Sequence, residues 1–246
     1  MKNRFYFSTA AFPNMITMLN LIAGFFSILM SIHGRFELAV WCIFLALILD
    51  SLDGHVARIF GNETEFGREL DSLADLISFV TAPCILVVQA CFPKASISLL
   101  VVIVCYLAAG AFRLARFNVN PTSGGRFDGL PTPAAALTVS MTILAFLKNG
   151  WEERQLFLNS AIFLMTAISF LMVSDIPYPK VSAIKFRTWR PLFFLQIILF
   201  SVFLFLFNIE TAVAVVFLVF LVLAPFYCTP KNGSADSGQG KDSQCS

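Results

Sequence analysis

The chain has 246 residues, of which 58% are hydrophobic and 28 are phenylalanine, and its mean hydropathy is +0.80. Ordinary soluble domains do not have this composition, so we expect an all-α integral membrane protein. The net charge of +2 gives no indication of a nucleic-acid partner, and the six scattered cysteines lack a Cys-x2-Cys pair that would indicate a zinc site.

About eight transmembrane helices are expected, from apolar runs that approach the roughly 20 residues needed to cross a bilayer. An N-terminal segment, residues 1–12, mixes Lys2 and Arg4 with aromatic residues and is expected to lie at the membrane interface. A core domain over residues 13–190 follows, then a C-terminal helix pair over 191–228 and a disordered cytoplasmic tail over 229–246. The expected spans are residues 14–32, 36–58, 67–91, 96–117, 129–147, 155–173, 191–207 and 210–226.

The first expected span carries two polar side chains, Thr17 and Asn20, among apolar residues. Lone polar residues in a membrane helix most often form hydrogen bonds with a neighbouring helix. Contact with a bound ligand is the alternative for both residues.

Four aspartates stand at the ends of the second and third apolar runs, between residues 50 and 75. An unpaired carboxylate near the middle of a bilayer costs about 2.5 to 3.5 kcal/mol, so several in one short stretch need a compensating partner. One aspartate at a helix end is usually a cap or a solvated residue, but four at these spacings favour a functional site. They are Asp50, Asp53, Asp71 and Asp75.

Helical spacing of about 100° per residue places each aspartate pair on one face of its expected helix. The first face also carries Gly54, Ala57 and Arg58, and the second carries Gly67. Because residues 59–66 contain glycine and asparagine, the helices can turn there and bring the two acidic faces together.

Such a cluster of four carboxylates would be neutralised by two divalent cations, Mg²⁺ or Mn²⁺, which prefer oxygen ligands. Gly54 and Gly67 have no side chain and would let a ligand approach the backbone. Arg58 could neutralise a phosphate oxygen beside the metals. The sequence therefore predicts a polar, metal-containing cavity.

The spacing D-x2-D-G-x2-A-R-x8-G-x3-D-x3-D, complete in residues 50–75, resembles the signature of the CDP-alcohol phosphatidyltransferases. The resemblance implies an integral membrane enzyme with two metal ions, a CDP-linked lipid donor, an alcohol acceptor and CMP as leaving product. It also implies that the first span lies beside the nucleotide. The residues implied to contact the CDP-lipid are Thr17, Asn20, Gly54, Ala57, Arg58 and Gly67.

Three later stretches, residues 112–118, 127–135 and 174–180, are similar to the phosphatidylserine synthase branch of that family. Serine carries a carboxylate, so its site should contain an arginine or an equivalent group of donors. Arg113 and Arg116 stand three residues apart at a helix end and could reach one site. They could also simply extend to lipid headgroups. Arg126 is a further cationic candidate.

The resemblance implies that CDP-diacylglycerol places its diphosphate on the metals and its acyl chains in the bilayer. Asp75 is implied to be the general base for the hydroxyl of L-serine as well as a metal ligand. Phosphatidylserine and CMP would be the products, formed in one displacement at phosphorus.

Charge distribution predicts the orientation of the chain in a cell membrane. With the N-terminus cytoplasmic and eight spans, 13 of the 17 basic residues lie on the cytoplasmic side, as the positive-inside rule requires. Both termini and the aspartate cluster are then expected near the cytoplasm. The four basic residues on the other side are Arg35, Lys94, Lys148 and Arg154.

Two other functions are compatible with buried carboxylates. The same chemistry could use glycerol 3-phosphate or an inositol compound as acceptor, and a phosphorylated acceptor should require more cationic residues. An ion-coupled transporter also places carboxylates within the membrane, but it would show internal repeats, and none is apparent. A homodimer is one candidate for the oligomeric state.

Overall fold

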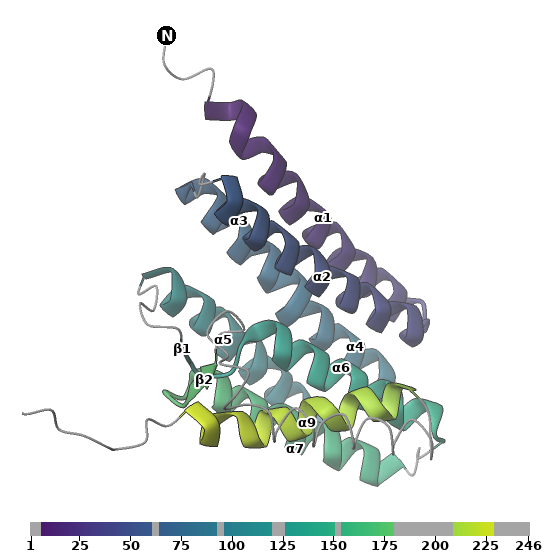
Figure 1. Cartoon of the computed structure of the whole chain (residues 1–246). Coiled ribbons are helices and arrows are strands. Elements are labelled where there is room, and N and C mark those ends of the chain that lie inside the picture. Colours follow the sequence, from purple (N-terminus) through teal and green to yellow (C-terminus); the bar gives the residue numbers. More distant parts are fainter. Residues whose placement is uncertain are drawn as a thin grey trace, which may run out of the picture.

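The computed structural model describes residues 6–60, 64–92, 96–119, 126–150, 154–179 and 209–228, and all statements below concern these segments. The fold is helical except for two strands of three residues each (Figure 1). The elements are α1 (Tyr6–Ile32), α2 (Phe36–Phe60), α3 (Glu65–Asp75), the π-helix η1 (Leu76–Thr81), α4 (Ala82–Cys91), α5 (Ile97–Val119), β1 (Arg126–Asp128), α6 (Thr132–Lys148), α7 (Arg154–Val173), β2 (Pro177–Pro179) and α9 (Ile209–Cys228).

Four segments are long and apolar enough to cross a membrane, and each coincides with an expected span. They are Asn14–Ile32, Glu65–Cys91, Ile97–Val119 and Gln155–Val173. α2, α6 and α9 occupy the positions of three further expected spans, while the expected span 191–207 lies outside the described residues. The total of eight spans therefore stays a prediction.

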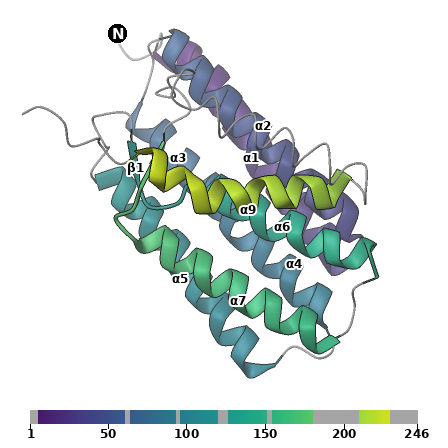
Figure 2. The ribbon, with the colours of Figure 1, turned by 60° about the horizontal axis from the view of Figure 1, so that its bottom comes forward.

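The helices form one packed bundle in which α6 has contacts with several other helices. α1 contacts α2, α3 and α4, whereas α5 contacts α7, and α6 contacts both α2 and α9. Figure 2 shows α9 running along α6, with α5 and α7 beside them. Large apolar side chains such as Phe25 and Phe163 are exposed on the outside, as suits a surface in contact with lipid.

The third expected span is one continuous helical segment with a change of winding directly after Asp75. The six residues Leu76–Thr81 form a π-helix, and Pro83 follows in the first turn of α4. Proline has no N–H, so the carbonyl of Phe79, four residues earlier, cannot receive its usual helical bond. Tyr106 of α5 donates its hydroxyl to that carbonyl at 3.3 Å. A buried tyrosine thus satisfies a backbone group that lipid could not.

Close contact between α1 and η1 depends on a glycine. A Cβ atom at Gly24 would overlap Ser78, whose hydroxyl donates to the backbone carbonyl of Asn20 at 3.0 Å. The small residue lets the two helices approach, as is common in membrane helix packing.

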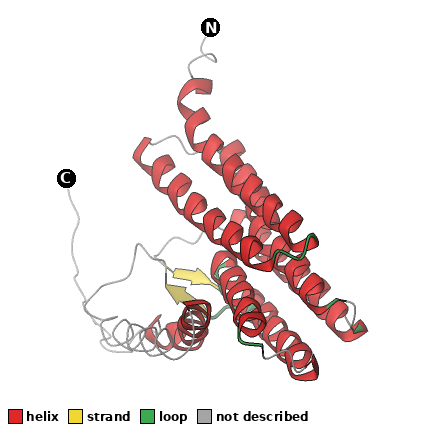
Figure 3. Cartoon of the chain, turned by 90° about the vertical axis from the view of Figure 1, so that its right-hand side faces the viewer, coloured by secondary structure: helices red, strands yellow, loops and turns green. Residues whose placement is uncertain are grey.

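The two strands form an antiparallel ladder at one end of the helices, with Phe127 opposite Tyr178 (Figure 3). The polar stretch of residues 119–128, between two expected spans, predicted a loop and no strand. Gly129 follows β1 with φ +82°, a conformation that favours glycine, and its N–H donates to Ile176 at 2.9 Å. The chain then enters α6 at Thr132. The ladder thereby fixes where α6 begins relative to the end of α7.

Candidate metal centre and active site

The two acidic helix faces meet as the sequence predicted. Oxygen atoms from Asp50, Asp53 and Asp71 all lie within 4.8 Å of one another. Asp53 is buried, and Asp50 and Asp71 are half-buried. Asp75, one turn further along α3, is 9% exposed and interacts electrostatically with Asp50 and Asp71. α2 and α3 thus bring four carboxyl groups close together.

Helix α3 is capped at its start and bonded to α5 further along. The Thr64 side chain accepts a hydrogen bond from the Gly67 N–H at 3.0 Å and caps the helix. Ser72 donates to the Asn118 side chain of α5 at 3.0 Å. Sequence reasoning did not single out Ser72 or Asn118, although Asn118 belongs to one of the quoted stretches.

The two predicted polar residues of α1 are both buried, and one of them contacts the acids. Thr17 is 4% exposed and hydrogen-bonds the side chain of Asp53. Asn20 is fully buried, and neither polar atom of its side chain has a hydrogen-bond partner in the described part of the chain. A buried amide without partners costs roughly 1 to 3 kcal/mol, so Asn20 is suited to bind a ligand.

The two glycines of the motif differ in their surroundings. A Cβ at Gly54 would have open space, whereas at Gly67 it would come within 3.1 Å of the Asn14 side-chain oxygen. Only the Gly54 surface is therefore open beside the acids. Ala57 and Arg58 belong to α2, but their side chains lie outside the described part of the structure.

A cavity of about 550 Å³ opens beside the carboxylates, a size typical of ligand sites. It brings together elements that are far apart in the chain. Its described polar lining consists of Asp50, Ser51, Asp71, Ser72, Asp75, Arg113 and Thr132.

Arg113 is the cation of this cavity among the described residues. It is 6% exposed and donates to the Thr132 hydroxyl at 3.2 Å, from α5 to the first turn of α6. Arg113 and Asp75 also attract each other electrostatically. A buried guanidinium needs opposite charge nearby, and the acids supply it. Thr132 was not predicted as a site residue.

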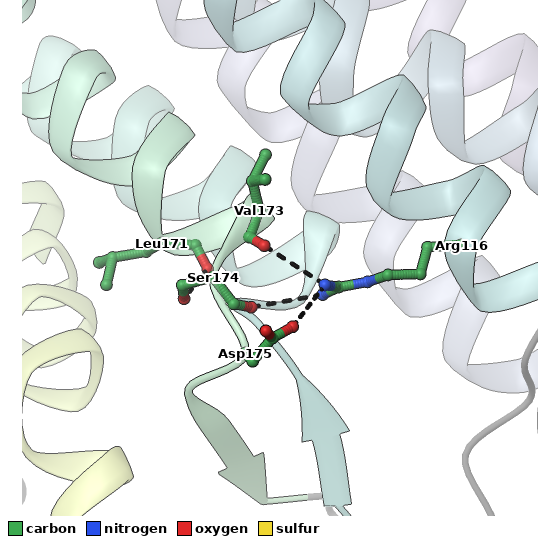
Figure 4. Close-up of polar contacts among 5 residues, drawn as sticks. All are labelled: Arg116, Leu171, Val173, Ser174 and Asp175. Carbon is green, nitrogen blue, oxygen red and sulfur yellow. Dashed lines mark hydrogen bonds and ion pairs between the residues drawn. The ribbon is translucent and has the colours of Figure 1, made fainter.

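Arg116 is directed elsewhere, although it lies only three residues further along α5. Its guanidinium donates to Asp175 at 2.8 Å and to the carbonyls of Val173 and Ser174, each at 3.3 Å (Figure 4). It does not line the cavity. Arg126 lies in β1, paired with Pro179, and its side chain lies outside the described part of the structure. Of the two predicted serine-binding arginines whose side chains are described, Arg113 lines the cavity and Arg116 does not, while the role of Arg126 stays a prediction.

The acidic residues fit divalent cations. One oxygen each of Asp53, Asp71 and Asp75 is buried without a hydrogen-bond partner among the described residues. Unpaired carboxylate oxygens are the ligands that Mg²⁺ and Mn²⁺ prefer, and leaving them buried without a partner is costly. The triad of Asp50, Asp53 and Asp71 could therefore hold a divalent cation.

A membrane protein with such a cluster beside a buried arginine is equipped to bind metal ions together with an anionic ligand. The sequence of residues 10–173 matches the family described as CDP-alcohol phosphatidyltransferase. The chain belongs to this family, whose members are membrane-bound transferases that generally use divalent metals.

Three curated relatives share much of the chain. An archaetidylserine synthase of Methanothermobacter thermautotrophicus is 41% identical over 186 residues, which cover 74% of this chain and 75% of the relative. A CDP-diacylglycerol–serine O-phosphatidyltransferase of Helicobacter pylori is 36% identical over 199 residues, covering 77% and 79%. A protein of the same name from Methanocaldococcus jannaschii is 39% identical over 165 residues, covering 67% and 72%.

Proposed function

We propose that the protein transfers the phosphatidyl group of CDP-diacylglycerol to L-serine, with phosphatidylserine and CMP as products. The names of the three relatives share serine as the acceptor. The observation that carries the proposal is the position of Arg113, buried in the same cavity as the carboxylates and attracted to Asp75. A cation placed there can hold the carboxylate of serine while its hydroxyl points to a base.

Four carboxylates form the proposed metal site: Asp50, Asp53, Asp71 and Asp75. Two bound Mg²⁺ or Mn²⁺ ions would supply charge stabilisation at the phosphoryl oxygens and at the departing CMP. Three unpaired buried oxygens support this assignment. Asp53 is oriented from α1 by its hydrogen bond to Thr17.

Asp75 is proposed as the general base. It would accept the proton of the serine hydroxyl while that oxygen forms a bond to the lipid-bearing phosphorus, and the bond from phosphorus to the CMP oxygen breaks. Arg113 then has two tasks, to bind the serine carboxylate and to balance the charge of Asp75. Thr132 orients Arg113 through the 3.2 Å hydrogen bond.

The nucleotide and the diphosphate are proposed to lie against α1 and the motif helices. Thr17 and Asn20 are buried, Thr17 hydrogen-bonds Asp53, and the backbone at Gly54 is open. The motif residues Ala57, Arg58 and Gly67 complete the proposed contacts. The core over residues 13–190, with both chain ends in the cytoplasm, would place this site where water-soluble serine arrives.

The experiment is a headgroup-resolved product analysis with the purified full-length protein in detergent or lipid discs. CDP-diacylglycerol and Mg²⁺ or Mn²⁺ are supplied with serine, glycerol 3-phosphate or inositol, and released CMP is measured alongside the lipid. Phosphatidylserine should form with equimolar CMP, and chelation should stop the reaction until metal is restored. Product with glycerol 3-phosphate or inositol but not serine would identify another acceptor. Absence of CMP release with every acceptor would favour a transporter.

The carboxylates provide the matched series for that assay. Asp50→Asn, Asp53→Asn and Asp71→Asn preserve size and should each abolish turnover in a protein that still elutes as a folded species. Retained activity in excess chelator, or in all three variants, would contradict the proposed metal site.

A further inference from the structure

Helix α9 lies beyond residues 10–173, the part of the chain that matches the family, and still forms a wall of the cavity. Val216, Phe217 and Phe220 line it. These residues are spaced so that they share one face of a helix. The sequence of this helix showed only a generic apolar pattern, so its place at the site comes from the tertiary structure.

The position of α9 is fixed by contacts at its start. The Asn149 side chain, at the end of α6, donates to the Thr211 hydroxyl at 2.8 Å and to the Ala145 carbonyl at 2.8 Å. Ala212 and Ala214 are buried, which lets α9 pack closely along α6. The cavity wall is therefore a packed element of the fold.

The cavity has a polar and an apolar part. The polar part includes Asp50, Asp71, Asp75 and Arg113. The apolar part of the cavity combines α9 with apolar residues of α2 and α6, among them Leu47 and Leu137. An amino-acid acceptor with two charged groups would lose hydration against such a wall. A lipid donor carries both chemistries, since its diphosphate and its acyl chains are joined through one glycerol.

We propose that the α9 face formed by Val216, Phe217 and Phe220 binds the acyl chains of the lipid donor, so that a longer chain makes more contact with it than a shorter one. The inference rests on the proposed function, because the diphosphate must lie at the acids for the chains to reach this wall. Phe217 and Phe220 are half-buried, so each keeps surface available for a chain. α9 would thereby set the preference for the lipid, while the matched core sets the chemistry.

The test measures kcat/KM for two donors, CDP-dioctanoylglycerol and CDP-dioleoylglycerol, at saturating serine. Phe217→Ala and Phe220→Ala should each lower the value for the dioleoyl donor about fivefold or more, because apolar contact is lost. The value for the dioctanoyl donor should fall less, and the KM for serine should stay within about twofold of the parent, as expected when the serine contacts are untouched. Two controls are matched: Phe163→Ala removes an equally large side chain that is 76% exposed on α7, and Val222→Ala alters an exposed site on α9.

Equal losses for both donors, or an unchanged ratio in both phenylalanine variants, would overturn the proposal. If an alanine variant does not fold, Phe217→Leu and Phe220→Leu keep the comparison available, and the same change in donor ratio is required. Failure of the proposed function is distinguishable, because the parent protein would then make no phosphatidylserine from either donor.

Discussion

Two arginines on one turn of α5 have opposite surroundings. Arg113 is buried in the cavity, against Thr132 and near Asp75. The Arg116 side chain extends from α5 to the end of α7, where its guanidinium donates to two backbone carbonyls and to the exposed Asp175. Two residues of the same type, three positions apart on one helix, therefore need not belong to the same site. The site that each arginine joins depends on which neighbouring element its long side chain can reach.

The difference follows from the ends of the neighbouring helices. The last carbonyls of a helix have no N–H partner within the helix. At the end of α7, Arg116 donates to the Val173 carbonyl, and the Leu130 N–H donates to the Leu171 carbonyl at 3.1 Å. Gly129 fits here because a Cβ would lie only 2.6 Å from the Met172 carbonyl. Arg116 therefore stabilises the junction from which α6 starts, and α6 carries Thr132 to Arg113.

The largest expected effect lies on the cavity side of this comparison. Asp75→Asn should lower kcat by about 10² to 10⁴, because the proposed base is lost, while CDP-diacylglycerol still binds. Asp175→Asn is the matched control, since it makes the same change beside Arg116 and should keep most of the activity. The measurements are single-turnover rates and donor binding. A similar loss in both variants would remove the distinction, and a loss beyond about 10⁴ would indicate that Asp75 is also essential as a metal ligand.

The next effect compares the arginines directly. Arg113→Ala should raise the KM for serine by about one to two decades, since losing a charged hydrogen bond costs roughly 1.5 to 3 kcal/mol. Arg116→Ala should leave that KM nearly unchanged. Initial rates over a serine series at saturating donor give both values, and Arg113→Lys tests whether charge without the planar guanidinium is enough. A raised serine KM in Arg116→Ala, with Arg113→Ala like the parent, would reverse the assignment.

The smallest effect concerns stability at the α7 junction. Asp175 is 91% exposed, so Asp175→Asn should change the free energy of unfolding by about 0 to 1 kcal/mol. Arg116→Ala should cost more, about 0.5 to 1.5 kcal/mol, because it also removes the hydrogen bonds to two backbone carbonyls. Thermal unfolding of the two variants and of the double variant gives the coupling energy. Equal costs for the two single variants would mean that the ion pair, rather than the carbonyl contacts, holds the junction.

The sequence by itself determined the acidic cluster and the class of protein. Four carboxylates at helical spacing, each at the end of an apolar run, need a cation or another compensating partner. The structure brings oxygen atoms of Asp50, Asp53 and Asp71 within 4.8 Å of one another. The membrane helices were predictable for the same reason, because apolar runs of sufficient length depend on composition alone. Four of them are confirmed as long and apolar enough to cross a bilayer.

Only the tertiary structure decided the rest of the cavity. Whether Arg113 or Arg116 faces the acids depends on where α6 begins and where α7 ends. The spacing of two arginines on α5 gives no information about either position. Thr132, Asn118 and Phe217 reach the site region from segments far apart in the chain, and each has an ordinary local pattern. Local periodicity fixes the face on which a residue lies, whereas the partner of that face is set by packing between helices distant in sequence.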